Sequence, residues 1–166
     1  MSMSYGHTIA VSPLQFVNAF NAIINGGKFQ YSTLIKKEDY NKDSSTEIIT
    51  ENTSKRIRKL LREVVGNKEG SGKNANIKGY SIGGKTGTAI KNKENRSGYK
   101  EENRTSFVGF FPSYDPKYIV FIMVDNPKGI KETFYYATGG WVAAPTVKKI
   151  INEMIPRLGV EPEIAY

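Results

Sequence analysis

Eleven consecutive residues, Gly79 to Ala89, carry the side chains best suited to chemistry, with the sequence Gly-Tyr-Ser-Ile-Gly-Gly-Lys-Thr-Gly-Thr-Ala. Two kinds of site fit them. Gly79 to Thr86 matches the phosphate-binding loop G-x-x-x-x-G-K-[ST], in which backbone N–H groups surround a nucleotide's phosphates. Lys85-Thr86-Gly87 matches the Lys-Thr-Gly signature of serine acyl-transfer enzymes. The neighbouring elements must therefore decide between an NTPase and an acyl-transfer enzyme.

Helices are predicted on both sides of this segment. Residues 12–24 begin with Ser-Pro-Leu-Gln, which combines a capping box with proline at the first helical position. Residues 52–65 carry apolar side chains at helical spacing, and so does a last segment that starts near Trp141. Pro156 is expected to end or kink that last helix.

Strands are predicted at 29–35, 80–90, 104–111 and 118–125. Between the last two lies a tight turn, Pro-Ser-Tyr-Asp-Pro at 112–116. A connection this short joins antiparallel strands, because parallel strands need a crossover of about a dozen residues or more. The sequence therefore predicts an α+β fold with a three-stranded antiparallel sheet and flanking helices.

The same elements disfavour the NTPase interpretation. Asp125 does end an apolar strand, as a magnesium-binding aspartate would. A phosphate loop, however, leads directly into a helix whose N-terminus meets the phosphates. Here Thr86 is followed by Gly-Thr-Ala-Ile, which favours a strand.

The composition narrows the remaining function classes. The chain has 166 residues, 39% of them hydrophobic and 24% charged, which predicts one globular domain with a real core. Its net charge of +8 favours anionic partners such as nucleic acid, a membrane surface or a cell-wall polymer. It has no cysteine, so disulfides and thiolate metal sites are excluded. We expect no cofactor, no metal and no nucleic acid.

The motif and the segments around it resemble the end of a class B penicillin-binding protein, most of all the division-type transpeptidase. The resemblance covers Ser4 to about Pro162, with Thr8 standing where the family usually has glycine. It rests on five segments, which are Ser4–Gln15, Gly84–Ala89, Arg104–Pro112, Tyr118–Pro127 and Gly139–Pro145.

The resemblance implies roles for the motif strand. In the family a serine attacks a D-Ala–D-Ala stem peptide, and β-lactams mimic that peptide. Lys85 is expected to attract the substrate's terminal carboxylate and to polarise neighbouring hydroxyls. Thr86 and Thr88 share one face of the strand and are expected to bind the carboxylate, while Gly87 leaves room for close approach. The Thr88 backbone N–H is the expected second donor of the oxyanion hole.

Two family motifs are missing before Lys85, namely the nucleophile motif S-x-x-K and the second motif S-x-N. Ser97-Gly-Tyr-Lys100 fits S-x-x-K literally, but it follows the motif strand in a polar linker, where a rigid helical Ser–Lys pair is not expected. Residues 1–166 are therefore interpreted as the C-terminal portion of a transpeptidase domain. The resemblance implies a five-stranded sheet, of which three strands are here, and we expect this chain to be inactive by itself.

The predicted function is part of a peptidoglycan D,D-transpeptidase that cross-links septal wall on the periplasmic side of the inner membrane. No membrane segment or signal peptide is visible in the chain. The implied partners are the stem peptide, β-lactams, the N-terminal half of the domain and divisome proteins. Two alternatives stay open: a serine β-lactamase fragment, and a basic module that binds anionic polymer or nucleic acid.

Overall fold

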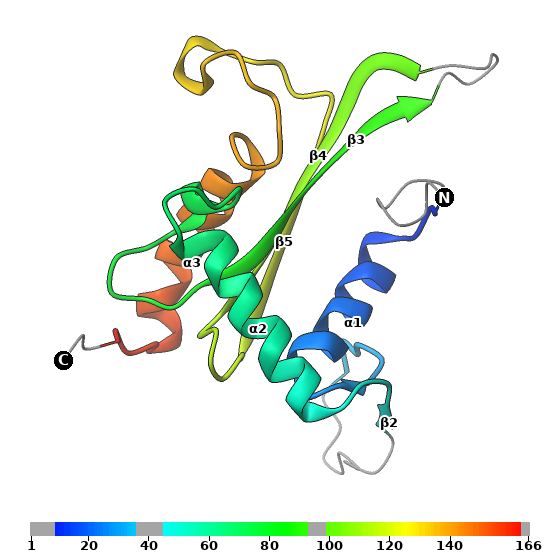
Figure 1. Cartoon of the computed structure of the whole chain (residues 1–166), viewed down its shortest axis with the longest axis vertical. Helices are drawn as coiled ribbons and strands as arrows, with labels where there is room; N and C mark the ends of the chain where they lie inside the picture. Colours follow the sequence, from blue (N-terminus) through cyan, green and yellow to red (C-terminus); the bar gives the residue numbers. More distant parts are fainter. Residues whose placement is uncertain (1–8, 36–44, 93–98, 164–166) are drawn as a thin grey trace. The chain divides into compact units, whose positions relative to one another are not determined.

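The computed structural model describes residues 9–35, 45–92 and 99–163, and the chain divides into two compact units, residues 1–58 and 59–166 (Figure 1). The first unit contains helix α1 (Pro13–Ile24). As predicted, Ser12 Oγ accepts from the Gln15 backbone N–H over 3.2 Å, and Gln15 Oε1 accepts from the Ser12 N–H over 2.9 Å. This reciprocal pair satisfies two backbone donors and fixes the start of the helix.

The strand predicted at 29–35 is wrong for most of its length. Only β1 (Lys28–Phe29) is a strand, and it pairs antiparallel with β2 (Thr46–Glu47). Leu34 and Ile35 are exposed, so the apolar residues that suggested a strand are not buried in a core. Because β2 has only two residues, it cannot pair with a strand that runs from 29 to 35. The polar residues 38–45, whose composition predicts a loop, lie mostly outside the described residues.

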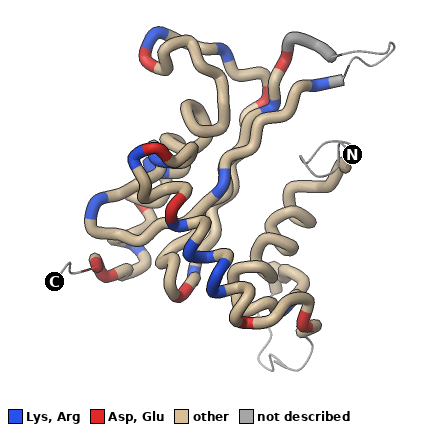
Figure 2. Tube along the Cα trace, viewed as in Figure 1, with Lys and Arg blue, Asp and Glu red and all other residues tan. Residues whose placement is uncertain are grey.

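Helix α2 (Glu51–Gly66) lies within one residue of its predicted bounds at each end. Its Lys and Arg positions are coloured blue in Figure 2, whereas α1 carries no charged residue. Glu51 and Lys55 form an exposed ion pair of 2.8 Å, and Arg58 donates to the Ile24 carbonyl over 2.7 Å. An exposed (i, i+4) pair supports a helix by only about 0.3–0.5 kcal/mol.

The second unit is built on a three-stranded antiparallel sheet in the order β3-β4-β5. β3 is Gly83–Asn92, β4 is Tyr99–Phe111 and β5 is Tyr118–Asp125. β5 has its predicted bounds. β4 begins five residues before its predicted start, because its first residues also pair with the end of β3. These residues are polar and show no apolar alternation, so the sequence pattern did not predict a strand there. The predicted α+β class and the antiparallel sheet are confirmed.

Helix α3 (Ala143–Leu158) packs on β4 and β5. Val147 and Ile151 on this helix are fully buried with Phe107 and Phe111 of β4, in the core of the second unit. Full burial of one such side chain contributes about 1.5–3 kcal/mol. Pro156 lies inside the helix rather than ending it, and the helix stops at Leu158, just before a left-handed Gly159.

Within the described part of the chain, no helix is long and apolar enough to cross a bilayer.

Candidate functional site

The motif residues Lys85 to Thr88 lie on β3, at one edge of the sheet. Lys85 pairs with Val108 on β4, and Thr88 pairs with Thr105. The other edge of β3 has no strand partner among the described residues. An edge strand with an unpaired side leaves backbone donors and acceptors available to an extended ligand or to another segment of protein.

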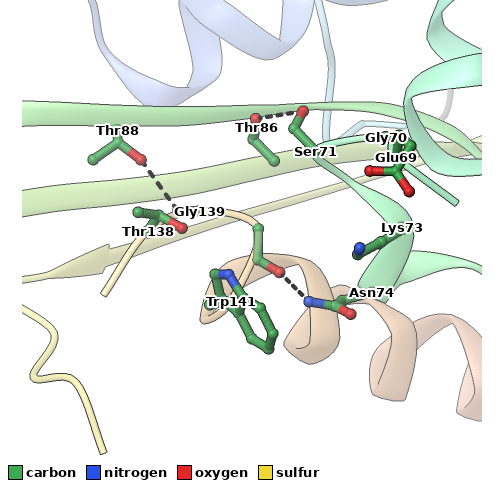
Figure 3. A pocket seen from close by; sticks show the side chains of 11 residues that line it. Glu69, Gly70, Ser71, Lys73, Asn74, Thr86, Thr88, Thr138, Gly139 and Trp141 are labelled. Atoms are coloured by element: carbon green, nitrogen blue, oxygen red, sulfur yellow. Dashed lines mark hydrogen bonds between the residues drawn. The ribbon is translucent and has the colours of Figure 1, made fainter. Parts of the chain in front are cut away.

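An open pocket of about 360 Å³ adjoins this strand (Figure 3). Three segments line it: residues 69–74 without Gly72, the two threonines Thr86 and Thr88 of β3, and residues 138–141. The structure therefore brings both predicted substrate-binding threonines into one cavity, as their alternation along the strand requires. All three segments belong to the second unit.

Side-chain hydrogen bonds join the three segments. Ser71 Oγ lies 3.2 Å from Thr86 Oγ1, and the Gly139 backbone N–H donates to Thr88 Oγ1 over 3.1 Å. The Asn74 amide donates to the Gly140 carbonyl over 2.8 Å. These bonds are drawn as dashed lines in Figure 3. They hold two loops against the motif strand, so the cavity has a defined shape.

The hydrogen-bond pattern determines what the hydroxyls offer to a ligand. A hydroxyl has one O–H donor and two acceptor lone pairs. Because Thr88 Oγ1 already accepts the Gly139 N–H, its own O–H remains to be donated. Ser71 and Thr86 share one hydrogen bond, so the hydroxyl that accepts it also keeps its proton for a ligand. The pocket therefore presents O–H donors, which suits a carboxylate or another anion.

Lys85 lies apart from this pocket. Its ammonium donates to the Thr86 carbonyl over 3.0 Å, and Lys85 does not line the cavity. Strand alternation directs its side chain to the face opposite Thr86 and Thr88. Thus the structure brings Thr86 and Thr88 together and separates the motif's lysine from them.

Gly87 makes room for protein backbone. A Cβ atom on Gly139 would come within 2.7 Å of the Gly87 carbonyl oxygen and 2.4 Å of the Ser106 carbonyl oxygen. A Cβ on Gly87 itself would lie 2.5 Å from Ser106 Oγ. The 138–141 segment therefore rests directly on the motif strand, which two glycines make possible.

Ser71, Asn74 and Gly140 belong to the site but carry no predicted role. The glycines at 70 and 72 match part of a dinucleotide fingerprint, but they follow a helix and not a strand, so the match does not indicate a nucleotide site. Their actual role is close packing: a Cβ on Gly70 would lie 2.3 Å from the Val64 carbonyl oxygen, and one on Gly72 would lie 2.9 Å from the Phe107 ring. Ser97, the literal S-x-x-K serine, lies outside the described residues.

An aromatic cluster borders the pocket. Trp141, which lines the pocket, makes an edge contact with Phe134 (5.4 Å between ring centroids) and stacks on Tyr136 (5.9 Å). Phe134 and Tyr136 are exposed. The pocket thus combines hydroxyl donors with an apolar wall, as ligand sites commonly do.

Asp125, the aspartate that an NTPase would use for magnesium, is committed to ion pairs. Lys91 lies 2.7 Å from its carboxylate and Arg104 lies 3.3 Å from it, which ties β3, β4 and β5 together. The hydrogen bond from Lys91 lowers the pKa of Asp125, and the same bond raises the pKa of Lys91. Across the described residues, no group of three or more carboxylate or histidine side chains could hold a metal ion.

Known proteins match this chain along nearly its whole length. Residues 1–152 match the family model for the penicillin binding protein transpeptidase domain. The chain is 43% identical to Stage V sporulation protein D of Bacillus subtilis and 37% identical to the probable peptidoglycan D,D-transpeptidase FtsI of Caulobacter vibrioides, over 96% of this chain in each case. These matches take in 25% and 28% of the two relatives, so the chain spans about a quarter of their length.

A solved structure agrees with the sequence matches. The apo TP domain of Burkholderia pseudomallei penicillin-binding protein 3 superimposes with a TM-score of 0.84 at 32% identity. The superposition covers 98% of this chain and 47% of that one.

Proposed function

Since this chain belongs to the penicillin-binding protein transpeptidase domain family, we propose that it forms the carboxylate-binding wall of a peptidoglycan D,D-transpeptidase site. The observation that carries the proposal is the meeting of Thr86 and Thr88 in one pocket, where the Thr88 hydroxyl and one hydroxyl of the Ser71–Thr86 pair remain available as donors. The substrate is a stem peptide that ends in D-Ala–D-Ala, and a β-lactam carries a carboxylate at the corresponding place.

In this proposal each motif residue has a separate task. Thr86 and Thr88 donate to the terminal carboxylate of the stem peptide. The Thr88 backbone N–H stabilises the oxyanion of the tetrahedral intermediate. Lys85, on the other face of the strand, supplies positive charge to the nucleophile's hydroxyl network, and Gly87 permits the close packing of the wall.

The nucleophile comes from a segment outside these 166 residues. The sequence before Lys85 contains neither S-x-x-K nor S-x-N, and the exposed edge of β3 is where such a segment would dock. Residues 1–166 are then the C-terminal portion of the transpeptidase domain, and they do not react with β-lactams by themselves. The serine of the other half attacks the penultimate D-alanine carbonyl, D-alanine leaves, and an amine of a second stem peptide takes the acyl group.

The names of the relatives support a proposal about the cellular role. They include a protein named for sporulation and several named peptidoglycan D,D-transpeptidase FtsI. We propose that the complete protein cross-links septal peptidoglycan on the outer side of the cytoplasmic membrane, with divisome proteins as partners.

Intact-mass spectrometry after incubation with benzylpenicillin tests the proposal. We expect no adduct on the 166-residue chain. We expect one adduct per molecule after joining the chain to an S-x-x-K-bearing N-terminal half of a class B transpeptidase domain, mapped to the serine of that motif. An adduct on the separate chain, mapped to Ser97, would overturn the assignment of the nucleophile.

A further inference from the structure

Lys73, in the segment Gly70–Asn74, lines the pocket. The roles proposed for the motif residues of β3 leave this lysine without a function. We propose that Lys73 recognises the ligand's carboxylate, as the counter-charge to the hydroxyl donors of Thr86 and Thr88. This inference rests on the proposed function, because it takes the pocket to be the carboxylate site.

The pocket needs a charge that its hydroxyls do not supply. A carboxylate that leaves water loses solvation, and neutral donors compensate for that loss less well than a cation does. Lys85 is the cation expected from the sequence, but its ammonium bonds the Thr86 carbonyl and lies off the pocket lining. Lys73 is the lysine that lines the pocket, among the residues that the structure describes.

Lys73 is available to a ligand. Its side chain is exposed, and the described residues give its ammonium no hydrogen bond or ion pair. Figure 3 shows this side chain between Ser71 and Asn74. Glu69 also lines the pocket, without an ion pair to Lys73, so it opposes an anion there.

The backbone beneath Lys73 is fixed on both sides. The Lys73 N–H donates to the Gly70 carbonyl over 3.1 Å, and the next residue, Asn74, is tied to Gly140. Gly72 donates to the Val64 carbonyl over 3.0 Å. The Cα atom is therefore held in place, and a bound carboxylate would have to order only the side chain.

Ser71 supports the same function as a positioning residue. Its hydroxyl lies 3.2 Å from Thr86 Oγ1 and limits the rotation of the threonine hydroxyl. The segment thus offers the charge through Lys73 and orients one of the donors through Ser71.

The test is a titration of the full 166-residue chain with N-acetyl-D-alanyl-D-alanine, read from the NMR shifts of the Thr86, Thr88 and Gly139 amides. Lys73→Ala should weaken binding about two- to fivefold, as expected for an exposed charge pair. Lys73→Arg should retain wild-type affinity. Glu69→Gln should strengthen binding by a similar factor, and Lys78→Ala, an exposed lysine off the pocket lining, should change nothing.

The ligand provides a second control. The same dipeptide with a C-terminal amide has no negative charge, so wild type and Lys73→Ala should bind it equally. Equal affinity of these two proteins for the carboxylate form would overturn the role of Lys73 and leave the proposed function standing. If the wild-type chain shows no shift at Thr86 or Thr88 with the carboxylate form, the carboxylate wall itself is wrong, and this inference fails with it.

Discussion

The Gly139 backbone N–H donates to Thr88 Oγ1 over 3.1 Å, across a separation of 51 residues in the sequence. This bond uses a lone pair of the hydroxyl and leaves the O–H to be donated into the pocket. The loop at 138–141 therefore controls the motif strand in two ways. It closes one side of the cavity, and it sets the direction in which Thr88 donates.

Thr88→Val should remove both functions of the hydroxyl while keeping the shape of the side chain. In the joined, β-lactam-reactive protein we expect the acylation rate constant with benzylpenicillin to fall about tenfold to a hundredfold, since a hydrogen bond to a charged group contributes roughly 1.5–3 kcal/mol. Thr88→Ser should restore most of the rate. Thr146→Val, an exposed hydroxyl on α3, is the control, and an equal loss there would show that the effect is not local.

Gly139→Ala should destabilise the second unit by about 1–3 kcal/mol, because the new methyl group meets backbone that has no space to move. The contacts are the Ser106 and Gly87 carbonyl oxygens, at 2.4 and 2.7 Å. Urea unfolding monitored by Trp141 fluorescence measures the change. Gly66→Ala is the comparison, since its methyl group would meet only the movable guanidinium of Arg62. Equal stability of Gly139→Ala and wild type would mean that the 138–141 segment does not rest on β3.

Thr105→Val should leave the stability unchanged or raise it by about 1 kcal/mol. Thr105 is fully buried opposite Thr88, and its hydroxyl has no hydrogen-bond partner in the described part of the chain. Removing a buried donor that makes no bond removes a desolvation cost. Chemical denaturation of both proteins provides the measurement. A clear loss of stability would indicate that the hydroxyl is satisfied in solution, by water for example.

The Lys91–Asp125 ion pair predicts a pH dependence of stability. The pKa of Asp125 is lowered in the folded state, chiefly by its hydrogen bond with Lys91. A lowered carboxyl pKa gives stability that is present above the unfolded value, about 3.9, and is lost as the pH falls through the folded value. Asp125→Asn should therefore flatten the acid side of the stability curve, measured as urea midpoints across pH.

Lys91→Met should also reduce the loss of stability at acid pH, because it removes the main cause of the lowered pKa of Asp125. The pKa of Lys91 is raised, so its own contribution is present at neutral pH and is lost as the pH rises through its folded value. Both variants should therefore also lack the decrease in stability that wild type shows as the pH rises through the folded-state pKa of Lys91. An acid limb that stays unchanged in both variants would show that the pair does not stabilise the sheet.

Two strand predictions differ from the structure for related reasons: the strand predicted at 29–35 was too long, and β4 was predicted too short. Apolar residues such as Leu34 and Ile35 favoured a strand, but the available partner, β2, has only two residues. Conversely, the polar start of β4 gave no apolar alternation, yet it forms a ladder with the far end of β3. In both cases strand pairing decided the outcome, and pairing depends on a segment elsewhere in the chain.

The sequence by itself determined what local chemistry controls. The Ser12–Gln15 capping box located the first helix, the short turn at 112–116 required an antiparallel hairpin, and the alternation at Thr86 and Thr88 put two hydroxyls on one face. Only the tertiary structure decided that Ser71, Asn74 and Gly139 complete the pocket and that Lys85 lies outside it. Asn74 reaches Gly140 across 66 residues, and such contacts leave no periodic pattern. They arise because glycines let two loops approach the strand closely, which is a property of the packed fold.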